Sequence, residues 1–284
     1  MKCFYHTDMD GHCAGAIVYQ AMKNQEDDGT GFEFIPINYN HDFPFEKIRP
    51  NEEVVIVDFS LQKPGDFEKL LNITSRIIWI DHHKTAIEKH SHLDRSIKGI
   101  RRDGVSGCEL TWAYFTHDKP TPIAVALLGD YDIWAFKYGE DTNLFQAASR
   151  LYDTKPESEI WKKWLNPKYD LLYEIEAGKV ALKYRDNYYA GLVKAWGFPV
   201  IFEGYRAICC NAGSVSSQLF DTVPESDYDI MMPFVFDGTK WTVSLYTKKK
   251  EIDVSEIAKR YGGGGHRQAS GFQCEKLPFN PEAR

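Results

Sequence analysis

The chain runs Arg76-Ile77-Ile78-Trp79-Ile80-Asp81-His82-His83 in one segment, where an apolar run changes at once to acidic and basic side chains. A short, bulky and partly β-branched run of this kind is typical of a strand that is buried on both faces of a parallel sheet. The polar residues after such a strand lie at the carboxyl edge of the sheet, where open α/β sheets place their functional sites. The segment therefore predicts an α/β fold with a site at this edge.

The same change from apolar to polar residues occurs twice more upstream. Lys2-Cys3-Phe4-Tyr5 leads into His6-Thr7-Asp8-Met9-Asp10-Gly11, and Val54-Val55-Ile56-Val57 leads into Asp58. Between these runs we expect helices over 13–22 and 66–71 and a further strand over 32–37. This alternation predicts a parallel sheet with right-handed βαβ crossovers.

The side chains gathered at this edge have the chemistry of a divalent metal site. Aspartates in one place repel each other unless cations neutralise them. Carboxylate oxygens with one or two imidazoles suit Mn²⁺ or Mg²⁺ better than a structural zinc ion, which prefers thiolates. Two such ions, about 3.5–4 Å apart, stabilise the attacking and leaving oxygens of phosphoryl transfer. The pattern indicates a two-metal phosphoesterase.

Each motif also has a plainer interpretation. A strand-end Asp is often a helix cap or turn residue, and a His-His pair alone is often a satisfied core or surface pair. The segment 8–11 resembles the start of a calcium loop, but the ligand positions that follow hold Cys13, Gly15 and Ile17, which excludes that interpretation. The conjunction of three strand-then-acid units favours the metal site.

Length and composition bound the class of protein. The 284 residues are enough for two modest domains, and the 43% hydrophobic and 26% charged fractions are typical of a globular protein. A net charge of −7 argues against an extended basic surface for long nucleic acid. It leaves room for a small anionic substrate whose charge is met by metals and a few local cations.

Cysteine spacing and hydropathy indicate the compartment. The six cysteines show no Cys-x-x-Cys spacing, which favours reduced thiols over a zinc ribbon or a disulfide framework. No signal-like stretch precedes Asp8, and no apolar run approaches membrane-spanning length. We expect a soluble, cytoplasmic protein with no membrane partner. The oligomeric state stays open, a homodimer included.

Two helices are expected after the third strand-then-acid unit. Ser106-Gly107-Cys108-Glu109 forms a capping box, and the helix start behind it is either a phosphate-binding site or an ordinary capped end. A buried helix over 122–128 ends in Gly129-Asp130-Tyr131-Asp132. Residues 153–195 have helical periodicity and predict connecting helices.

Beyond Gly197 the pattern changes to a second, smaller α/β domain. Strands are expected over 200–202, 205–210, 230–236 and 241–246, with a hairpin at 237–239 between the last two. The domains we expect are therefore a metal-binding catalytic domain (1–152), a helical connector (153–196) and a substrate-binding domain (197–284).

A glycine run lies near the end of the second domain. A capping box at 253–256 opens a helix that ends at Tyr261, and Gly262-Gly263-Gly264-Gly265-His266-Arg267 follows. Glycine after a helix is a routine cap, but four glycines exceed what a cap needs and expose N–H groups in the geometry of an anion nest. His266 and Arg267 add donors, which favours substrate binding by this run.

Together these segments resemble the DHH phosphoesterase family with its C-terminal DHHA1 domain, over nearly the whole chain. The segments that correspond to its four motifs are Asp8-Met9-Asp10, Asp58, Asp81-His82-His83 and Asp130, and the run 262–266 resembles the DHHA1 signature. The resemblance implies a Mn²⁺-dependent hydrolase with two metal ions, for which Mg²⁺ or Co²⁺ can substitute. Its site is expected in the cleft between the two domains.

The resemblance also implies a role for each motif residue. Asp8 serves the first metal, Asp10, His82 and Asp130 serve the second, and Asp58 bridges both and is catalytic. His83 faces the scissile phosphate and is catalytic, and Asp81 orients a histidine. The expected substrate contacts are Gly263, Gly264, Gly265, His266, Arg267 and Tyr246.

The chain departs from the family pattern at two positions. Many relatives have a metal-binding His four residues before the first Asp, where this chain has Phe4; His6 lies two residues before it and is expected as a neighbour of the site. Many DHHA1 domains with nucleotide substrates have an Arg where this chain has Tyr246, which stacks on a base or sugar and does not clamp phosphate.

The expected activity is that of an exonuclease-type oligoribonuclease. The chain is predicted to hydrolyse short oligonucleotides or linear dinucleotides to mononucleotides by in-line attack at phosphorus. Two alternatives stay open. One is a phosphatase for polyphosphate, pyrophosphate or a 3′-phosphonucleotide, and the other is a nucleotide-binding regulator without turnover.

Overall fold

The computed structural model describes residues 1–23, 31–39, 41–93, 95–117 and 119–279. These residues divide into two compact units, Met1–Ala181 and Leu182–Arg284, and the division falls inside helix α8 (Leu172–Trp196). Among the described residues, no helix combines the length and apolarity that a membrane span requires.

The first unit is built on a parallel four-stranded sheet. Its strands are β1 (Lys2–His6), β2 (Glu33–Ile37), β3 (Val54–Val57) and β4 (Ile77–Ile80). Its helices are α1 (Met9–Lys23), α2 (Asp66–Ile73), α3 (Lys84–Lys89), α4 (Gly107–Thr116), α5 (Ile123–Asp132), α6 (Glu140–Ser149) and α7 (Trp161–Trp164), with 3-10 turns at Phe45–Lys47 and Ser91–Leu93. The predicted α/β fold with a parallel sheet is confirmed.

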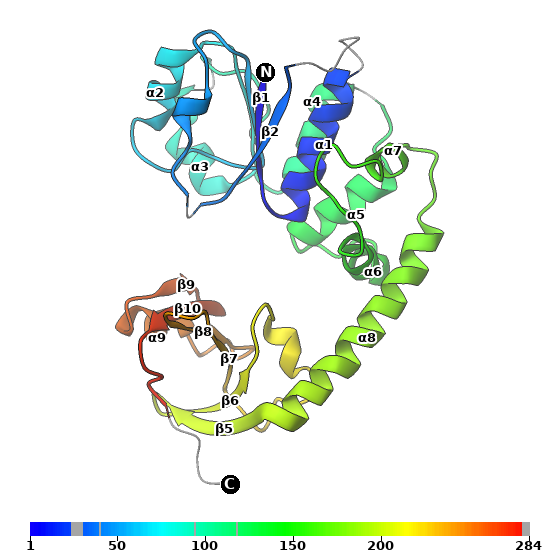
Figure 1. Ribbon diagram of the computed structural model, residues 1–284. Coiled ribbons are helices and arrows are strands. Elements are labelled where there is room, and N and C mark those ends of the chain that lie inside the picture. The colour runs from blue at the N-terminus through cyan, green and yellow to red at the C-terminus, as the bar shows by residue number, and fades with distance from the viewer. Residues whose placement is uncertain (24–30, 40, 94, 118, 280–284) are drawn as a thin grey trace. The chain divides into compact units, whose positions relative to one another are not determined.

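The order of the strands positions the site. The order is β2-β1-β3-β4, so the chain leaves β1 toward one side of the sheet and leaves β3 toward the other. The crevice outside the carboxyl ends of β1 and β3 is therefore the switch point where such sheets bind ligands. Helices α1 and α4 lie on one side of the sheet, and α2 and α3 lie on the other (Figure 1).

Alternation along the strands supplies a core on each face of this sheet. Cys3 and Tyr5 of β1 pack in the same core as α1 and α4, whereas Phe4 packs with Phe67 of α2 and Ala86 of α3. All four residues of β3 are fully buried, as the continuous apolar run predicts. Each fully buried side chain of this size contributes roughly 1.5–3 kcal/mol, so the strand ends are held firmly.

The second unit contains a mixed six-stranded sheet. Its elements are β5 (Gly197–Phe202), β6 (Tyr205–Asn211), β7 (Ile230–Phe236), β8 (Trp241–Tyr246), α9 (Val254–Arg260), β9 (Gly264–His266) and β10 (Ala269–Cys274), with a 3-10 turn at Ser217–Phe220. The order is β5-β6-β7-β8-β10-β9, in which only β6 and β7, among the paired neighbours, run parallel. The four predicted strands and the hairpin before β8 are confirmed, and β9 and β10 were not predicted.

Candidate metal centre

The predicted motif residues converge at the carboxyl edge of the parallel sheet. His6 ends β1, Asp58 follows β3, and the 81–83 segment follows β4. Asp10 lies in the first turn of α1, and Asp132 ends α5. Asp58 has a φ of 54°, a backbone region that non-glycine residues rarely adopt and that is found at functional sites.

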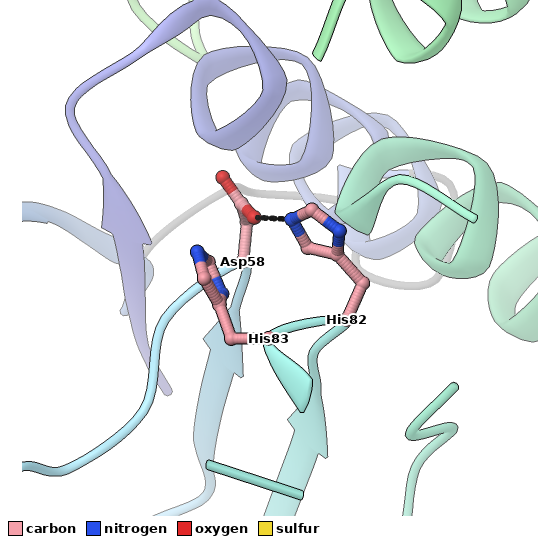
Figure 2. Close-up of side chains that lie close together, drawn as sticks. All are labelled: Asp58, His82 and His83. Atoms are coloured by element: carbon pink, nitrogen blue, oxygen red, sulfur yellow. Dashed lines mark ion pairs between the residues drawn. The ribbon is translucent and has the colours of Figure 1, made fainter. Parts of the chain in front are cut away.

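His82 lies at the centre of one group of ligands. Its Nε2 is 3.1 Å from Asp58 Oδ1, 3.4 Å from Asp132 Oδ2 and 4.0 Å from Asp10 Oδ2. Figure 2 shows the His82 ring pointing at the Asp58 carboxylate, with His83 beside them. Ligand atoms of Asp10, His82 and Asp132 all lie within 4.8 Å of one another, which is close enough for one metal ion to contact all three.

His6 lies at the centre of a second group. Its Nδ1 is 2.7 Å from Asp8 Oδ2 and 3.6 Å from Asp58 Oδ2, and the ligand atoms of these three residues also lie within 4.8 Å of one another. Asp58 also forms a third group with His82 and His83, so it joins the ligands around His6 to those around His82. His6 was expected only as a neighbour; its place at the very end of β1 is the sequence signal for its inclusion.

Several buried oxygens in these groups have no hydrogen-bond donor. Among the described residues, none donates a hydrogen bond to either carboxylate oxygen of Asp58 or to Oδ2 of Asp132, and all three atoms are buried. A buried carboxylate oxygen without a partner is costly, and a divalent cation satisfies it. The residues present therefore fit a divalent metal, with oxygen donors and one or two imidazoles in each group.

The pKa values of the carboxyl groups also indicate that the site binds a cation. Burial and repulsion by Asp58 raise the pKa of Asp10 to about 8, and burial and repulsion by Asp10 raise the pKa of Asp132 to about 7. Burial also raises the pKa of Asp58 well above its usual range. These carboxyls hold protons near neutral pH unless a cation replaces them.

In the group around His6, the histidine is the side chain that holds a proton at neutral pH, and Asp8 is ionised. Burial disfavours the charged form of His6, but the carboxylates of Asp58 and Asp8 outweigh burial and raise the pKa of His6 to about 10. Burial likewise opposes the ionisation of Asp8, but His6 lowers the pKa of Asp8 to about 2. This pair is therefore an ion pair until a metal displaces the proton of His6.

Helix α4 holds Asp10 in place through its N-terminus. Gly107 N donates to Asp10 Oδ2 at 2.6 Å, and Cys108 N donates to Oδ1 at 3.0 Å. A Cβ atom on Gly107 would lie 2.7 Å from Asp58 Cβ and 2.9 Å from Asp10 Oδ2, so the close approach requires glycine. The predicted cap by Ser106 is confirmed. The alternative of a phosphate at this helix start is wrong, because Asp10 occupies the two N–H groups.

Asp130 belongs to none of the ligand groups among the described residues. Its carboxylate accepts hydrogen bonds from Lys137 N at 2.9 Å, Tyr138 N at 3.4 Å and the Thr142 hydroxyl at 2.5 Å. Burial opposes the ionisation of Asp130, but these bonds, the one from the Thr142 hydroxyl foremost, outweigh it and lower the pKa of Asp130. Asp130 thus anchors the loop after α5, whereas Asp132 lies in the group around His82; that Asp130 serves the second metal stays a prediction.

His83 is held by Asp81, as the resemblance implies. Asp81 Oδ1 accepts from His83 Nδ1 at 2.7 Å and from the backbone N–H of His82 at 2.8 Å. Burial opposes protonation of His83, but the Asp81 carboxylate outweighs it and raises the pKa of His83. The Tyr39 hydroxyl lies 3.3 Å from both ring nitrogens of His83, a contact that the sequence did not indicate.

Several residues predicted to contact substrate in the second unit make contacts inside that unit, and their contact with substrate stays a prediction. Gly264–His266 forms edge strand β9, paired with β10, in place of the free nest that we expected. Arg267 donates to the Lys250 carbonyl at 2.8 Å and lies 3.5 Å from Asp253. Tyr246 is half-buried on β8 and packs against a core that includes Phe220. His266 is exposed, and Gly263 and Gly265 lie close to the backbone of β10.

The chain is similar to a known family and to several curated proteins. Residues 3–129 match the family described as "DHH family, N-terminal domain". An uncharacterized protein, R106, of Acanthamoeba polyphaga mimivirus is 28% identical over 242 residues, covering 83% of this chain and 56% of that protein. The chain thus spans little more than half the length of this relative. The bifunctional oligoribonuclease and PAP phosphatase NrnA of Mycoplasma genitalium is 25% identical over 292 residues, covering 94% of this chain and 86% of that protein.

Two solved structures share the fold over almost the whole chain. A pGpG-specific phosphodiesterase, PggH, from Vibrio cholerae superposes with a TM-score of 0.56 at 12% identity, covering 96% of this chain and 93% of its own. The exonuclease RecJ bound to manganese superposes with a TM-score of 0.51 at 14% identity, covering 95% of this chain and 84% of its own. These two likenesses concern the fold alone.

Proposed function

We propose, because residues 3–129 match the DHH family, that this chain is a two-metal phosphodiesterase of that family and hydrolyses short oligonucleotides or linear dinucleotides to mononucleotides. The observation that carries the proposal is the pair of ligand groups that meet at Asp58, whose two oxygens have no hydrogen-bond donor among the described residues. A nucleotide-binding regulator has no need of such a pair, which argues against that alternative.

We assign some of the described residues to metal binding and others to substrate binding. We assign His6 and Asp8 to one ion, Asp10, His82 and Asp132 to the other, and Asp58 to both. Mn²⁺ is the proposed metal, since the related exonuclease RecJ has been solved with manganese, and Mg²⁺ or Co²⁺ are the substitutes to test. When bound, the ions supply charge neutralisation at the transferred phosphoryl group. His83, oriented by Asp81, is the proposed contact to the scissile phosphate and the proton donor to the leaving oxygen.

A phosphatase activity on 3′-phosphonucleotides is the second candidate. The Mycoplasma genitalium relative is described as a bifunctional oligoribonuclease and PAP phosphatase, and its match covers 94% of this chain. The same ligand groups serve a terminal phosphate as well as a diester. The two activities are therefore compared on one preparation.

The test is hydrolysis of a substrate panel by the whole chain in Mn²⁺. The panel contains labelled di- to decanucleotides, pGpG, adenosine 3′,5′-bisphosphate and polyphosphate. A net charge of −7 argues against a long basic track, so dinucleotides are expected to be cleaved faster than decanucleotides at equal concentration of ends. Asp58→Ala is the control and is expected to lose roughly 10³-fold or more of the activity, because both ions lose a ligand. Faster cleavage of long strands, or polyphosphate as the best substrate, would contradict the proposal.

A further inference from the structure

The loop after α5 carries exposed aromatic rings next to the metal ligand Asp132. Trp134 and Phe136 have φ values of 57° and 49°, a region that bulky side chains rarely adopt. Such a conformation costs free energy and persists only where the surroundings hold it. Because this unfavourable backbone conformation follows Asp132 so closely in the chain, we looked for a functional role of the loop.

Asp130 is what holds this loop. Besides the three hydrogen bonds to its carboxylate, its carbonyl accepts from Ala135 N at 3.0 Å. Further turns close at 3.1 Å from Trp134 N to the Tyr131 carbonyl and at 3.2 Å from Gly139 N to the Phe136 carbonyl. The loop is therefore a fixed structure, and the position of Trp134 is set by the element that also carries Asp132.

The indole of Trp134 is braced at an angle by its two neighbours and stays open to solvent. Its ring centroid lies 4.7 Å from that of Phe136 at an interplanar angle of 79°, and 5.3 Å from that of Tyr131 at 68°. Neither neighbour lies parallel to the indole, and Trp134 is 65% exposed. A rigid aromatic surface of this kind suits a planar ligand, because a flat ring stacks on it without losing hydrogen bonds.

We propose that Trp134 is a stacking platform for one nucleobase of the substrate, beside the ligand group of Asp132. This inference rests on the proposed function and adds a recognition residue to it. Two observations favour a base over a second copy of the chain as the occupant. Trp134 follows the candidate ligand Asp132 by two residues, on the braced loop that begins where α5 ends. Tyr246, the stacking residue expected from the sequence, is half-buried against a core. Stacking is tolerant of base identity, so Trp134 raises affinity for short substrates without selecting one sequence.

The experiment measures KM and kcat for the 5′-phosphorylated diadenylate pApA and for two analogues in which one base at a time is replaced by hydrogen. We expect Trp134→Ala to raise KM for pApA by roughly 5- to 150-fold with kcat within about twofold, and Trp134→Phe to restore most of the affinity. One abasic analogue is expected to bind wild type as weakly as Trp134→Ala binds pApA. In the variant, removal of that same base should change nothing further.

Two matched variants separate stacking from folding. Trp134→Gly removes the ring but suits the positive φ, so a loss of affinity there does not come from a misfolded loop. Trp196→Ala removes a tryptophan that is 63% exposed in the second unit and is expected to leave KM unchanged. A KM for pApA that is the same in wild type, Trp134→Ala and Trp134→Gly would overturn the proposal. So would a change of oligomeric state in these variants by size-exclusion chromatography, which would make the ring a contact between copies.

The outcome is distinguishable from failure of the proposed function. Binding of pApA to the chelator-treated protein is followed by tryptophan fluorescence alongside the kinetics. If wild type binds pApA through Trp134 but does not hydrolyse it, the function fails and the stacking stands. If wild type hydrolyses pApA and Trp134→Ala has an unchanged KM, the function stands and the stacking is wrong. If wild type neither binds nor hydrolyses pApA, both are wrong.

Discussion

Asp130 and Asp132 are both aspartates and lie two positions apart, but they have different contacts. Asp130 accepts hydrogen bonds from the loop after α5, and Asp132 lies in a ligand group. Successive residues of a helix are about 100° apart, so residues i and i+2 at the end of α5 point to opposite sides. One side of this helix end faces the ligand groups, and the other faces the loop that ends at α6. Spacing alone does not tell which side is which, because residues 124–129 are buried all round the helix. The sequence therefore located the motif, but it did not single out Asp132 as the candidate ligand.

This difference predicts opposite phenotypes for two isosteric variants. Asp132→Asn removes a ligand charge and is expected to weaken Mn²⁺ binding by at least roughly 10- to 100-fold, the cost seen for outer-shell partners of metals. Asp130→Asn leaves one buried N–H facing an amide donor and is expected to cost about 1–3 kcal/mol of stability with nearly unchanged Mn²⁺ affinity. Titration calorimetry with Mn²⁺ and thermal melts of both variants measure the two quantities. Weaker metal binding in Asp130→Asn than in Asp132→Asn would restore Asp130 as the ligand.

At the scale of elements, the sequence predicted the strands that are apolar, and it missed the strands that form only by pairing with a neighbouring strand. Strand β3 was predicted with the bounds that the structure has, because four adjacent apolar residues are buried on both faces. Strand β10 was not predicted, since Ala269-Ser270-Gly271-Phe272-Gln273-Cys274 has only Phe272 buried and forms by pairing with β8. The same holds for β9, whose glycines gave no strand signal and which exists because β10 lies beside it.

The glycine run offers a test of recognition by β9. A Cβ atom on Gly264 meets nothing within 4 Å, and valine suits a strand, so Gly264→Val is expected to fold normally. If a substrate approaches this backbone closely, the variant raises KM, by up to roughly 100-fold, with Mn²⁺ binding intact. The measurement is steady-state kinetics on a dinucleotide.

A neighbouring position supplies the control for that variant. Gly265 has a φ of 139°, and its added Cβ would lie 2.7 Å from the Ala269 carbonyl, so Gly265→Val is expected to lose stability by about 1–3 kcal/mol. Thermal melts separate the two effects. Normal kinetics in a folded Gly264→Val protein would leave the glycines with a structural role only.

At the scale of the whole molecule, the candidate metal site contributes to the pH dependence of stability. In chelator-treated protein the folded pKa of Asp10 is about 8 and that of Asp132 about 7, against an ordinary value of 3.8 for each. Between about pH 4 and 8 the folded state thus holds protons that the unfolded state has lost, and stability falls as the pH rises. His6, with a pKa raised from 6.5 to about 10, acts in the same direction above pH 6.5. The lowered pKa of Asp8 acts oppositely, but only below about pH 4.

We therefore expect the chelated protein to melt several degrees lower at pH 8.5 than at pH 5.5. Saturating Mn²⁺ is expected to remove or reverse this slope, because the ion binds the deprotonated carboxylates. Differential scanning calorimetry with and without Mn²⁺ is the measurement. Asp10→Asn, which imitates the protonated carboxyl, is the control and is expected to show a shallower slope. A chelated wild type that gains stability across this range would contradict the charge assignment.

The contact of α4 with Asp10 has a consequence for the speed of metal loading. A ligating side chain that rotates freely loses conformational entropy when it binds an ion, and this loss opposes binding. Two backbone N–H groups of α4 already fix Asp10, so its side chain holds one rotamer before any ion binds. Exchange of one metal for another would then require no rearrangement of the Asp10 side chain.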